Sequence, residues 1–329
     1  MIYGGIEGGG TKWVCAVGSG HDDLQAIATI PTTTPVETID RVAEFFAARG
    51  DIAAIGVGSF GPLDLDERSP RFGTITTTPK PGWAGTNVRS LLTSKLGLPV
   101  VIETDVGAAA FGEGRFGAAK GLETFCYITV GTGIGGGAIA HGEISHGLLH
   151  PEFGHMRIPH DRRRDPFEGC CPYHGDCFEG LASGEALRQR FGVPAGELRA
   201  PEAWELEAEY VALGLVNVIC TLSPQRIILG GGVMNAPPLL SLVRDRVRLL
   251  AGEYFDTPAL RRGIVDYIVR PALGDRAGVI GALELAKIRS EQDASHDGGV
   301  PSRGLVDRRE TMIDSGVAGL PVANRERDA

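Results

Sequence analysis

The stretch Phe125–Ala140, which reads FCYITVGTGIGGGAIA, decides the fold of this chain. An apolar run ends in a glycine-rich turn and a short apolar run returns from it, a pattern typical of two strands joined in a hairpin. The N-terminal stretch Tyr3–Val17, YGGIEGGGTKWVCAV, has the same pattern. Because the arrangement occurs twice, the sequence predicts an α/β protein with a duplicated domain.

The glycine-rich turns of both hairpins approach nucleotide-binding motifs without satisfying them. Gly5–Gly10 has nearly the spacing of a P-loop, but Thr11 and Lys12 stand in reverse order and a strand follows where the P-loop needs a helix. Gly131–Gly136 matches G-x-G-x-x-G, yet more strand follows it as well. A third glycine loop, Gly230–Gly232, also follows an apolar strand. Each is explained alone as a tight turn, whereas two hairpins facing each other across a cleft suit a nucleotide's phosphates.

One carboxylate follows a predicted buried strand. Val100 to Glu103 is that strand, Asp105 lies at its carboxyl end, and a helical run begins at Val106. Ligands of open α/β sheets gather at the carboxyl ends of strands. A helix N-cap explains Asp105 equally well from local sequence alone.

The segment Thr74–Trp83, TITTTPKPGW, is extended, β-prone and closed by a proline-rich turn. A surface loop is its simplest interpretation. Lys80 and Trp83 would nevertheless suit the wall of a sugar or phosphate site, because one supplies an ammonium group and the other an aromatic face.

Metal-ligand chemistry is concentrated between Glu152 and Glu179. Cys171, His174 and Cys177 are spaced three apart, as short chelate loops around a tetrahedral cation require, and His155 would supply a fourth ligand. Two thiolates and two imidazoles favour zinc over magnesium or calcium, although another tetrahedral thiophilic ion fits nearly as well. Four protein ligands leave no open position, which is typical of a structural rather than a catalytic zinc site.

The composition excludes several classes of protein. The net charge of -9 over 329 residues argues against a nucleic-acid surface, which needs clustered Lys and Arg. Neither a membrane helix nor a signal peptide is evident, so we expect a cytoplasmic protein with no membrane partner. Six cysteines in a chain of this length do not form a disulfide framework. Residues 289–329 are polar and glycine-rich, and we expect a disordered tail.

Eight segments in collinear order carry a family resemblance. They are IEGGGTK (6–12), GSFGPLDL (58–65), TPKPGW (78–83), ETDVGAAAFGE (103–113), VGTGIGGG (130–137), HPEFGHM (150–156), CPYHGDCFEGLASG (171–184) and ILGGGV (228–233). Together they resemble the ROK sugar kinases, within the actin-like and hexokinase-like ATPases. TPKPGW and CPYHGDC resemble specifically the bacterial fructokinase branch.

The resemblance implies a duplicated ribonuclease-H-like fold of two lobes, with ATP and sugar bound between them. The expected N-terminal lobe comprises residues 1–116 with a returning helix at 277–288. The expected C-terminal lobe comprises residues 117–276, with the inserted zinc segment at 152–179. Relatives suggest a homodimer.

The resemblance also implies residue roles. Asp105 matches the catalytic base, and magnesium is expected to bridge ATP oxygens. Nucleotide-binding positions are matched by Gly9, Gly10, Thr11, Lys12, Gly131, Thr132, Gly133, Gly230, Gly231 and Gly232. Sugar-binding positions are expected at Gly61, Lys80, Trp83, Asp105, Glu152, His155 and Glu179. The metal set is His155, Cys171, His174 and Cys177, predicted to hold Glu152 and Glu179 against the sugar.

Three positions depart from the family pattern. Cys170 adds a thiol beside the first ligand cysteine and could compete for the metal. Gly107 replaces a frequent asparagine near Asp105, and Glu7 stands where the wider family often has aspartate.

A carboxylate such as Asp105 at a helix N-terminus is expected to stay ionised because of the amide dipoles.

The sequence therefore predicts an ATP-dependent fructokinase that forms fructose 6-phosphate. The alternatives are a kinase for mannose, glucose or an N-acetylhexosamine and, more remotely, a sugar-sensing regulator without catalysis. A DNA-binding repressor is disfavoured, because the first strand begins at Tyr3 and the chain is acidic. A chaperone-like or filament ATPase is disfavoured by the zinc and TPKPGW segments.

Overall fold

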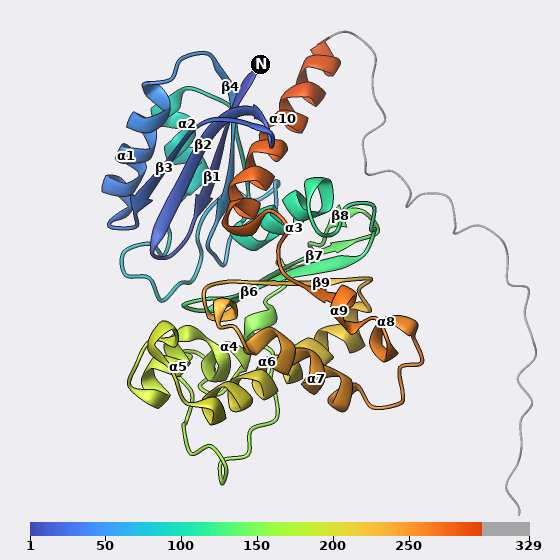
Figure 1. The fold of residues 1–329 in the computed structure, drawn as a ribbon. Coiled ribbons are helices and arrows are strands. Elements are labelled where there is room, and N and C mark those ends of the chain that lie inside the picture. The colour runs from blue at the N-terminus through green and yellow to red at the C-terminus, as the bar shows by residue number, and fades with distance from the viewer. Residues whose placement is uncertain (298–329) are drawn as a thin grey trace, which may run out of the picture. The chain divides into compact units, whose positions relative to one another are not determined.

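Two mixed sheets form the framework of residues 1–297, which this computed structural model describes (Figure 1). The first sheet has the order β3-β2-β1-β4-β5. Its strands are β1 (Ile2–Gly8), β2 (Lys12–Gly20), β3 (Asp23–Pro31), β4 (Ile52–Ser59) and β5 (Val100–Thr104). The first three strands are antiparallel, whereas β4 and β5 run parallel to β1.

The second sheet repeats this topology. Its order is β10-β9-β6-β7-β8, with β6 (Phe125–Val130), β7 (Ile134–Ala140), β8 (Glu143–Ile144), β9 (Ile227–Gly230) and β10 (Ile268–Val269). Strands β6, β7 and β8 form the antiparallel meander, and β9 and β10 continue parallel to β6. The predicted duplication is thus confirmed strand by strand, and the fold is a two-lobed α/β fold.

Helices surround both sheets and separate them. They are α1 (Pro35–Ala47), α2 (Val88–Leu96), α3 (Asp105–Phe116), α4 (Phe178–Ala182), α5 (Gly184–Phe191), α6 (Pro201–Leu222), α7 (Leu239–Ala251), α8 (Pro258–Arg261), α9 (Ile264–Tyr267) and α10 (Ala277–Asp297). Short 3₁₀ turns occur at η1 (Phe153–His155), η2 (Ala195–Glu197), η3 (Val233–Asn235) and η4 (Gly274–Arg276). The apolar cores of the two lobes lie on the helix-covered faces of their sheets.

Helices α3 and α10 lie where the two sheets approach each other (Figure 1). Glycines permit this contact: a Cβ at Gly137 of β7 would lie 2.3 Å from the Val106 carbonyl oxygen of α3. A Cβ at Gly56 of β4 would lie 1.7 Å from the Ala282 carbonyl oxygen of α10. Since no side chain fits there, α3 is held in direct backbone contact, and Asp105 at its first position is fixed between the lobes.

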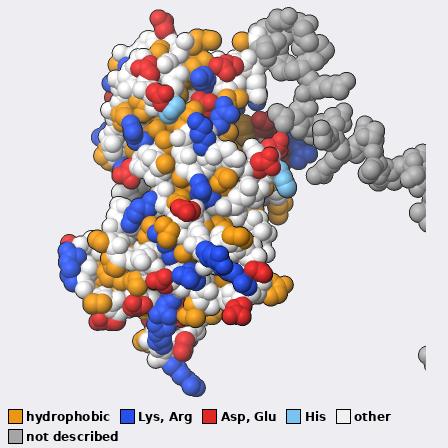
Figure 2. Space-filling model, turned by 45° about the vertical axis from the view of Figure 1, so that its right-hand side comes forward, with side chains coloured by type: hydrophobic (Ala, Val, Ile, Leu, Met, Phe, Trp, Pro, Cys, Tyr) orange, Lys and Arg blue, Asp and Glu red, His pale blue; other side chains and the backbone are white. Residues whose placement is uncertain are grey.

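The C-terminal helix extends further than the sequence indicated. We expected it to end at Ile288, but α10 reaches Asp297, so the first part of the expected disordered tail is helical. The remainder of that tail, residues 298–329, lies outside the described residues. Within residues 1–297, no helix is both long and apolar enough to cross a membrane. On the face shown in Figure 2, basic and acidic side chains are interspersed rather than separated by sign.

Candidate active site and metal centre

The first glycine hairpin, between β1 and β2, is held by backbone bonds. Gly9 N donates to Lys12 O (2.9 Å), and Thr32 Oγ1 donates to Gly9 O (2.7 Å). A Cβ at Gly10 would meet nothing within 4 Å, and both Thr11 and Lys12 are exposed. The tip of this turn is therefore open to an anion, as a phosphate-binding turn must be.

The second hairpin, between β6 and β7, is tied to the inserted segment. Gly131 N donates to Gly133 O (2.9 Å), and Gly184 N donates to Gly131 O (2.7 Å). Glu179 Oε2 accepts the amide of Ile134 at 2.9 Å. Gly133 is packed against the same carboxylate, because a Cβ there would lie 2.5 Å from Glu179 Oε2. The sequence marked Glu179 as a sugar ligand but gave no sign of its bond to this hairpin.

The helix N-cap alternative for Asp105 is wrong, because Thr104 is the N-cap. Thr104 Oγ1 accepts the Gly107 amide at 2.9 Å, while Asp105 is the first residue of α3 and its Oδ1 accepts the adjacent Val106 amide. The helix therefore does not need the Asp105 carboxylate to cap its first turn.

The pKa of Asp105 depends on burial as well as on the start of the helix. Burial raises the pKa of Asp105 to about 6, and nearby Glu103 raises it too. Hydrogen bonds from backbone amides at the start of the helix lower it and oppose these effects. The helix terminus alone thus does not hold this carboxylate at its ordinary pKa. A carboxylate with a pKa near 6 is still ionised at neutral pH and is a stronger base than an exposed aspartate.

Gly107 leaves room for a neighbouring acid. A Cβ at this position would lie 2.5 Å from Glu103 Oε1, which itself accepts the Thr104 amide at 2.7 Å. The other oxygen, Oε2, lies 2.9 Å from His146 Nε2. Glu103 therefore occupies the space that a larger residue at position 107 would need.

Further carboxylates lie near enough to Asp105 to shift one another's pKa. Burial raises the pKa of Glu152 to about 7, and repulsion from Glu179 and Asp105 adds to the shift. Burial likewise raises the pKa of Glu7 to about 7, with Asp105 raising it and Lys12 lowering it. These mutual interactions show that four acids lie near one another together with one lysine: Glu7, Asp105, Glu152, Glu179 and Lys12. The negative charge there would favour a cation or a hydroxyl-rich ligand over a free anion.

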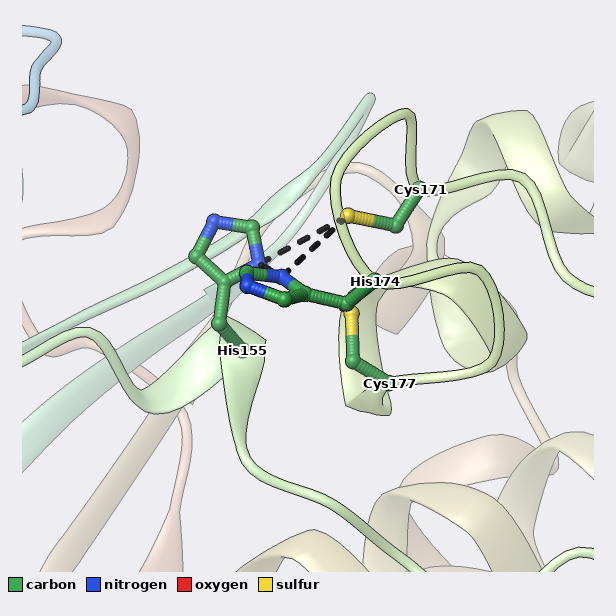
Figure 3. A group of neighbouring side chains, drawn as sticks. All are labelled: His155, Cys171, His174 and Cys177. Carbon is green, nitrogen blue, oxygen red and sulfur yellow. Dashed lines mark hydrogen bonds between the residues drawn. The ribbon is translucent and has the colours of Figure 1, made fainter. Parts of the chain in front are cut away.

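The four predicted metal ligands converge (Figure 3). One ligand atom from each of His155, Cys171, His174 and Cys177 lies within 4.8 Å of the others. His155 Nδ1 is 3.3 Å from His174 Nδ1, 3.8 Å from Cys171 Sγ and 3.7 Å from Cys177 Sγ. Tetrahedral zinc with ordinary Zn–N and Zn–S lengths requires edges of roughly 3.3 Å between nitrogens and roughly 3.5 Å between nitrogen and sulfur. The donor set and its spacing fit such an ion.

The other nitrogen of His155 is directed away from the cluster, so a single ring can serve both the metal and a neighbouring ligand (Figure 3). The adjacent Cys170 lies outside the cluster, since its Sγ is 3.8 Å from Ser183 Oγ. Glu179 follows Cys177 by two positions in α4. The four candidate ligands therefore lie in the same segment as Glu152 and Glu179.

Trp83 lies in the core, and the prediction that its ring forms a sugar wall is wrong. Its exposed fraction is 0%, its ring packs against Trp13 and Phe60, and its Nε1 donates to Thr33 O at 2.8 Å. The sequence misled because the indole follows an exposed Pro-Gly turn. Lys80, on that turn, is partly exposed.

The third glycine loop borders a cavity of about 800 Å³. Gly231 has φ +95°, and a Cβ there would lie 2.4 Å from the Val130 carbonyl oxygen, so only glycine is accommodated. The cavity is lined by Trp204, Arg199, Gly232, Asn235 and Pro238, among others. Its apolar wall and few polar groups are typical of a site for a flat, heteroaromatic ligand.

Sequence reasoning missed two histidines, His146 and His150, that contact predicted site residues or their neighbours. Gly61 packs beside the buried His150, because a Cβ at Gly61 would lie 3.4 Å from His150 Nε2. His146 contacts Glu103 as described above. The only local signal was the position of His150 at the start of HPEFGH.

The family match and the curated relatives both cover most of the chain. The model of the ROK family matches residues 3–289. A putative fructokinase of Bacillus subtilis (strain 168) is 47% identical over 298 residues, which cover 89% of this chain and 98% of the relative. A fructokinase of Zymomonas mobilis is 46% identical over 294 residues, covering 87% and 96% respectively.

Solved structures show the same arrangement. A ROK hexokinase from Thermus thermophilus superposes with a TM-score of 0.70 at 30% identity, covering 89% of this chain and 100% of that one. A ROK glucokinase from Streptomyces griseus, solved with glucose and AMPPNP, gives a TM-score of 0.72 at 27% identity and covers 88% and 100%.

Proposed function

This chain belongs to the ROK family, and from that premise we propose that it is an ATP-dependent fructokinase that converts D-fructose to fructose 6-phosphate. The observation that carries the proposal is the Asp105 carboxylate at the start of α3, which is not needed as the helix cap because Thr104 caps this helix. The fructokinase names of relatives at 46–47% identity supply the substrate.

In this proposal the nucleotide spans the three glycine loops. The adenine occupies the cavity beside Gly232, and the phosphates reach the tips of the hairpins at Gly9–Lys12 and Gly131–Gly133. Magnesium would offset the charge of the transferred phosphoryl group. Glu7 fits the water shell of such an ion, because its Oε2 is buried and has no hydrogen-bond partner among the described residues.

The sugar is proposed to lie against Glu152, His155 and Glu179, with Gly61 nearby. These groups accept and donate several hydrogen bonds at fixed angles, which suits a polyhydroxy substrate. Asp105 accepts the proton of the attacking 6-hydroxyl, since its pKa near 6 leaves it ionised at neutral pH. Phosphoryl transfer needs little more than this base, correct positioning and charge stabilisation.

We propose zinc as the metal held by His155, Cys171, His174 and Cys177. With four protein ligands its role is structural: it holds α4, and with it Glu179, beside the second hairpin. The proposed lobes are residues 1–116 with the returning helix, and residues 117–276. We further propose a cytoplasmic homodimer.

A coupled assay of ADP release over fructose, mannose, glucose and N-acetylated hexoses tests the proposal. Fructose should be turned over with the highest kcat/KM. A kinase for another hexose is the second candidate, because a glucokinase of Streptomyces coelicolor is 30% identical. Efficient turnover of glucose or mannose without fructose would establish that alternative.

A further inference from the structure

The segment Ser145–Glu152, SHGLLHPE, makes side-chain contacts between the C-terminal lobe and the N-terminal lobe. It follows β8 and contains two histidines that contact residues of the other lobe. His146 Nε2 lies 2.9 Å from Glu103 Oε2, at the end of β5. His150 contacts Leu63 in the chain that follows β4, and the segment ends at Glu152.

The hydrogen bond from Leu63 defines the chemical state of His150. The Leu63 amide donates to His150 Nε2 at 3.0 Å, so that nitrogen must carry a lone pair. The ring is then neutral and carries its proton on Nδ1. Burial, which lowers the pKa of His150, favours the same neutral form, although Glu103 and a hydrogen bond to the Pro151 backbone oppose the shift.

The protonated nitrogen lies beside the carboxylate of the cleft. His150 Nδ1 is 3.4 Å from Glu152 Oε1, and only 9% of the residue is exposed. One ring therefore touches the backbone of one lobe with Nε2 and a carboxylate of the other lobe with Nδ1.

The Leu63 side of this bridge is itself held in place. Pro62 O accepts bonds from Thr76 N (2.7 Å) and Thr76 Oγ1 (3.0 Å). The Cα of Gly61 faces the His150 ring closely enough that a Cβ would lie 3.4 Å from Nε2. Thr76 of the TITTTPKPGW segment thus fixes the backbone next to Leu63, the residue that donates to His150.

We infer that His150 is a positioning residue of the sugar site, which sets the orientation of Glu152 relative to the Gly61–Leu63 loop of the opposite lobe. The inference rests on the proposed function in one respect, that Glu152 contacts the hexose. A buried histidine with only a packing role would affect stability and both substrates alike. A positioning histidine affects the hexose and depends on Glu152.

Two isosteric variants separate the two contacts of the ring. His150→Gln places an amide oxygen near the position of Nε2 and keeps an acceptor for Leu63, but it removes the ring nitrogen that lies 3.4 Å from Glu152 Oε1. His150→Asn keeps a donor near Nδ1 and loses the Leu63 bond. We expect each to raise the dissociation constant of the hexose about tenfold, or about 1.4 kcal/mol, with the KM for ATP within twofold of wild type.

Calorimetry without ATP measures hexose binding, and a coupled assay measures kcat and the KM for ATP. In a Glu152→Gln background the His150 variants should add less than twofold, because the group that they orient has lost its charge. His21→Gln, on the β2–β3 turn, is the control and should leave every constant unchanged. Unchanged hexose binding, equal losses for hexose and ATP, or full additivity with Glu152→Gln would each overturn the inference.

A measurement on the wild-type protein covers the case in which the variants fold poorly. Nitrogen-15 NMR of histidine-labelled protein should show the His150 ring as the Nδ1–H tautomer, and an Nε2–H tautomer would contradict the bridge. The hexose used is the one that the wild type phosphorylates best. If fructose is not turned over, the proposed function fails, while the variants still test His150 with the accepted sugar.

Discussion

Gly133→Ala tests whether the inserted segment and the second hairpin act as one unit. An added Cβ would lie 2.5 Å from Glu179 Oε2, whereas carbon–oxygen contacts need roughly 3.3 Å. The carboxylate must therefore retreat by roughly 0.8 Å. That shift disturbs its 2.9 Å hydrogen bond from the Ile134 amide, which the same oxygen accepts.

The expected loss of kcat/KM follows from the charge of the Glu179 carboxylate that accepts this hydrogen bond. A hydrogen bond to a charged group contributes about 1.5–3 kcal/mol, so kcat/KM for the hexose should fall about 10- to 100-fold. Steady-state kinetics of Gly133→Ala, Glu179→Ala and the double variant provide the measurement. Because truncation of Glu179 removes the clash, Gly133→Ala should cost less than threefold in the Glu179→Ala background. Equal losses in both backgrounds would refute the coupling.

Four other outcomes are expected. Dialysis against a chelator should release about one zinc per chain and raise the KM for the hexose while ATP binding stays near normal; an unchanged KM with a collapsed kcat would instead indicate a catalytic ion. Trp83→Phe should lower the melting temperature because the bond to Thr33 O is lost, at about 2 kcal/mol, and a selective rise in hexose KM without destabilisation would restore the sugar-wall interpretation. Gly231→Ala should lower the melting temperature and weaken ATP binding, since its Cβ overlaps the Val130 backbone, and wild-type behaviour would contradict the geometry. The kcat/KM of the wild type should fall as the pH drops below about 7, because Glu152 and then Asp105 take up protons, and a flat profile down to pH 5 would contradict their roles.

The sequence was sufficient where short-range pattern determines structure. The two hairpins were visible because apolar alternation and glycine-rich turns lie within about fifteen residues of each other. The metal cluster was equally visible, since three of its ligands are spaced three apart. Asp105 could be placed at a strand end, but its freedom depended on Thr104, and local sequence did not distinguish the two caps.

Contacts between distant parts of the chain were not predictable in this way. Trp83 is buried by Trp13 and Phe60, neither of which lies near it in sequence. The His150 contact to Leu63 joins residues 87 positions apart, and the lone histidine before Pro151 gave no indication of a partner. The raised pKa of Asp105 likewise comes from burial between two lobes, which no local motif expresses.

Asp105 is proposed as the base of the reaction, and the Asp105→Asn variant tests this role. Asparagine preserves size and polarity but cannot accept the hydroxyl proton. With fructose and ATP saturating, we predict that kcat falls by about 10²- to 10⁴-fold while the calorimetric dissociation constant of fructose stays within threefold of wild type. A variant that retains more than a tenth of the wild-type kcat would contradict the account.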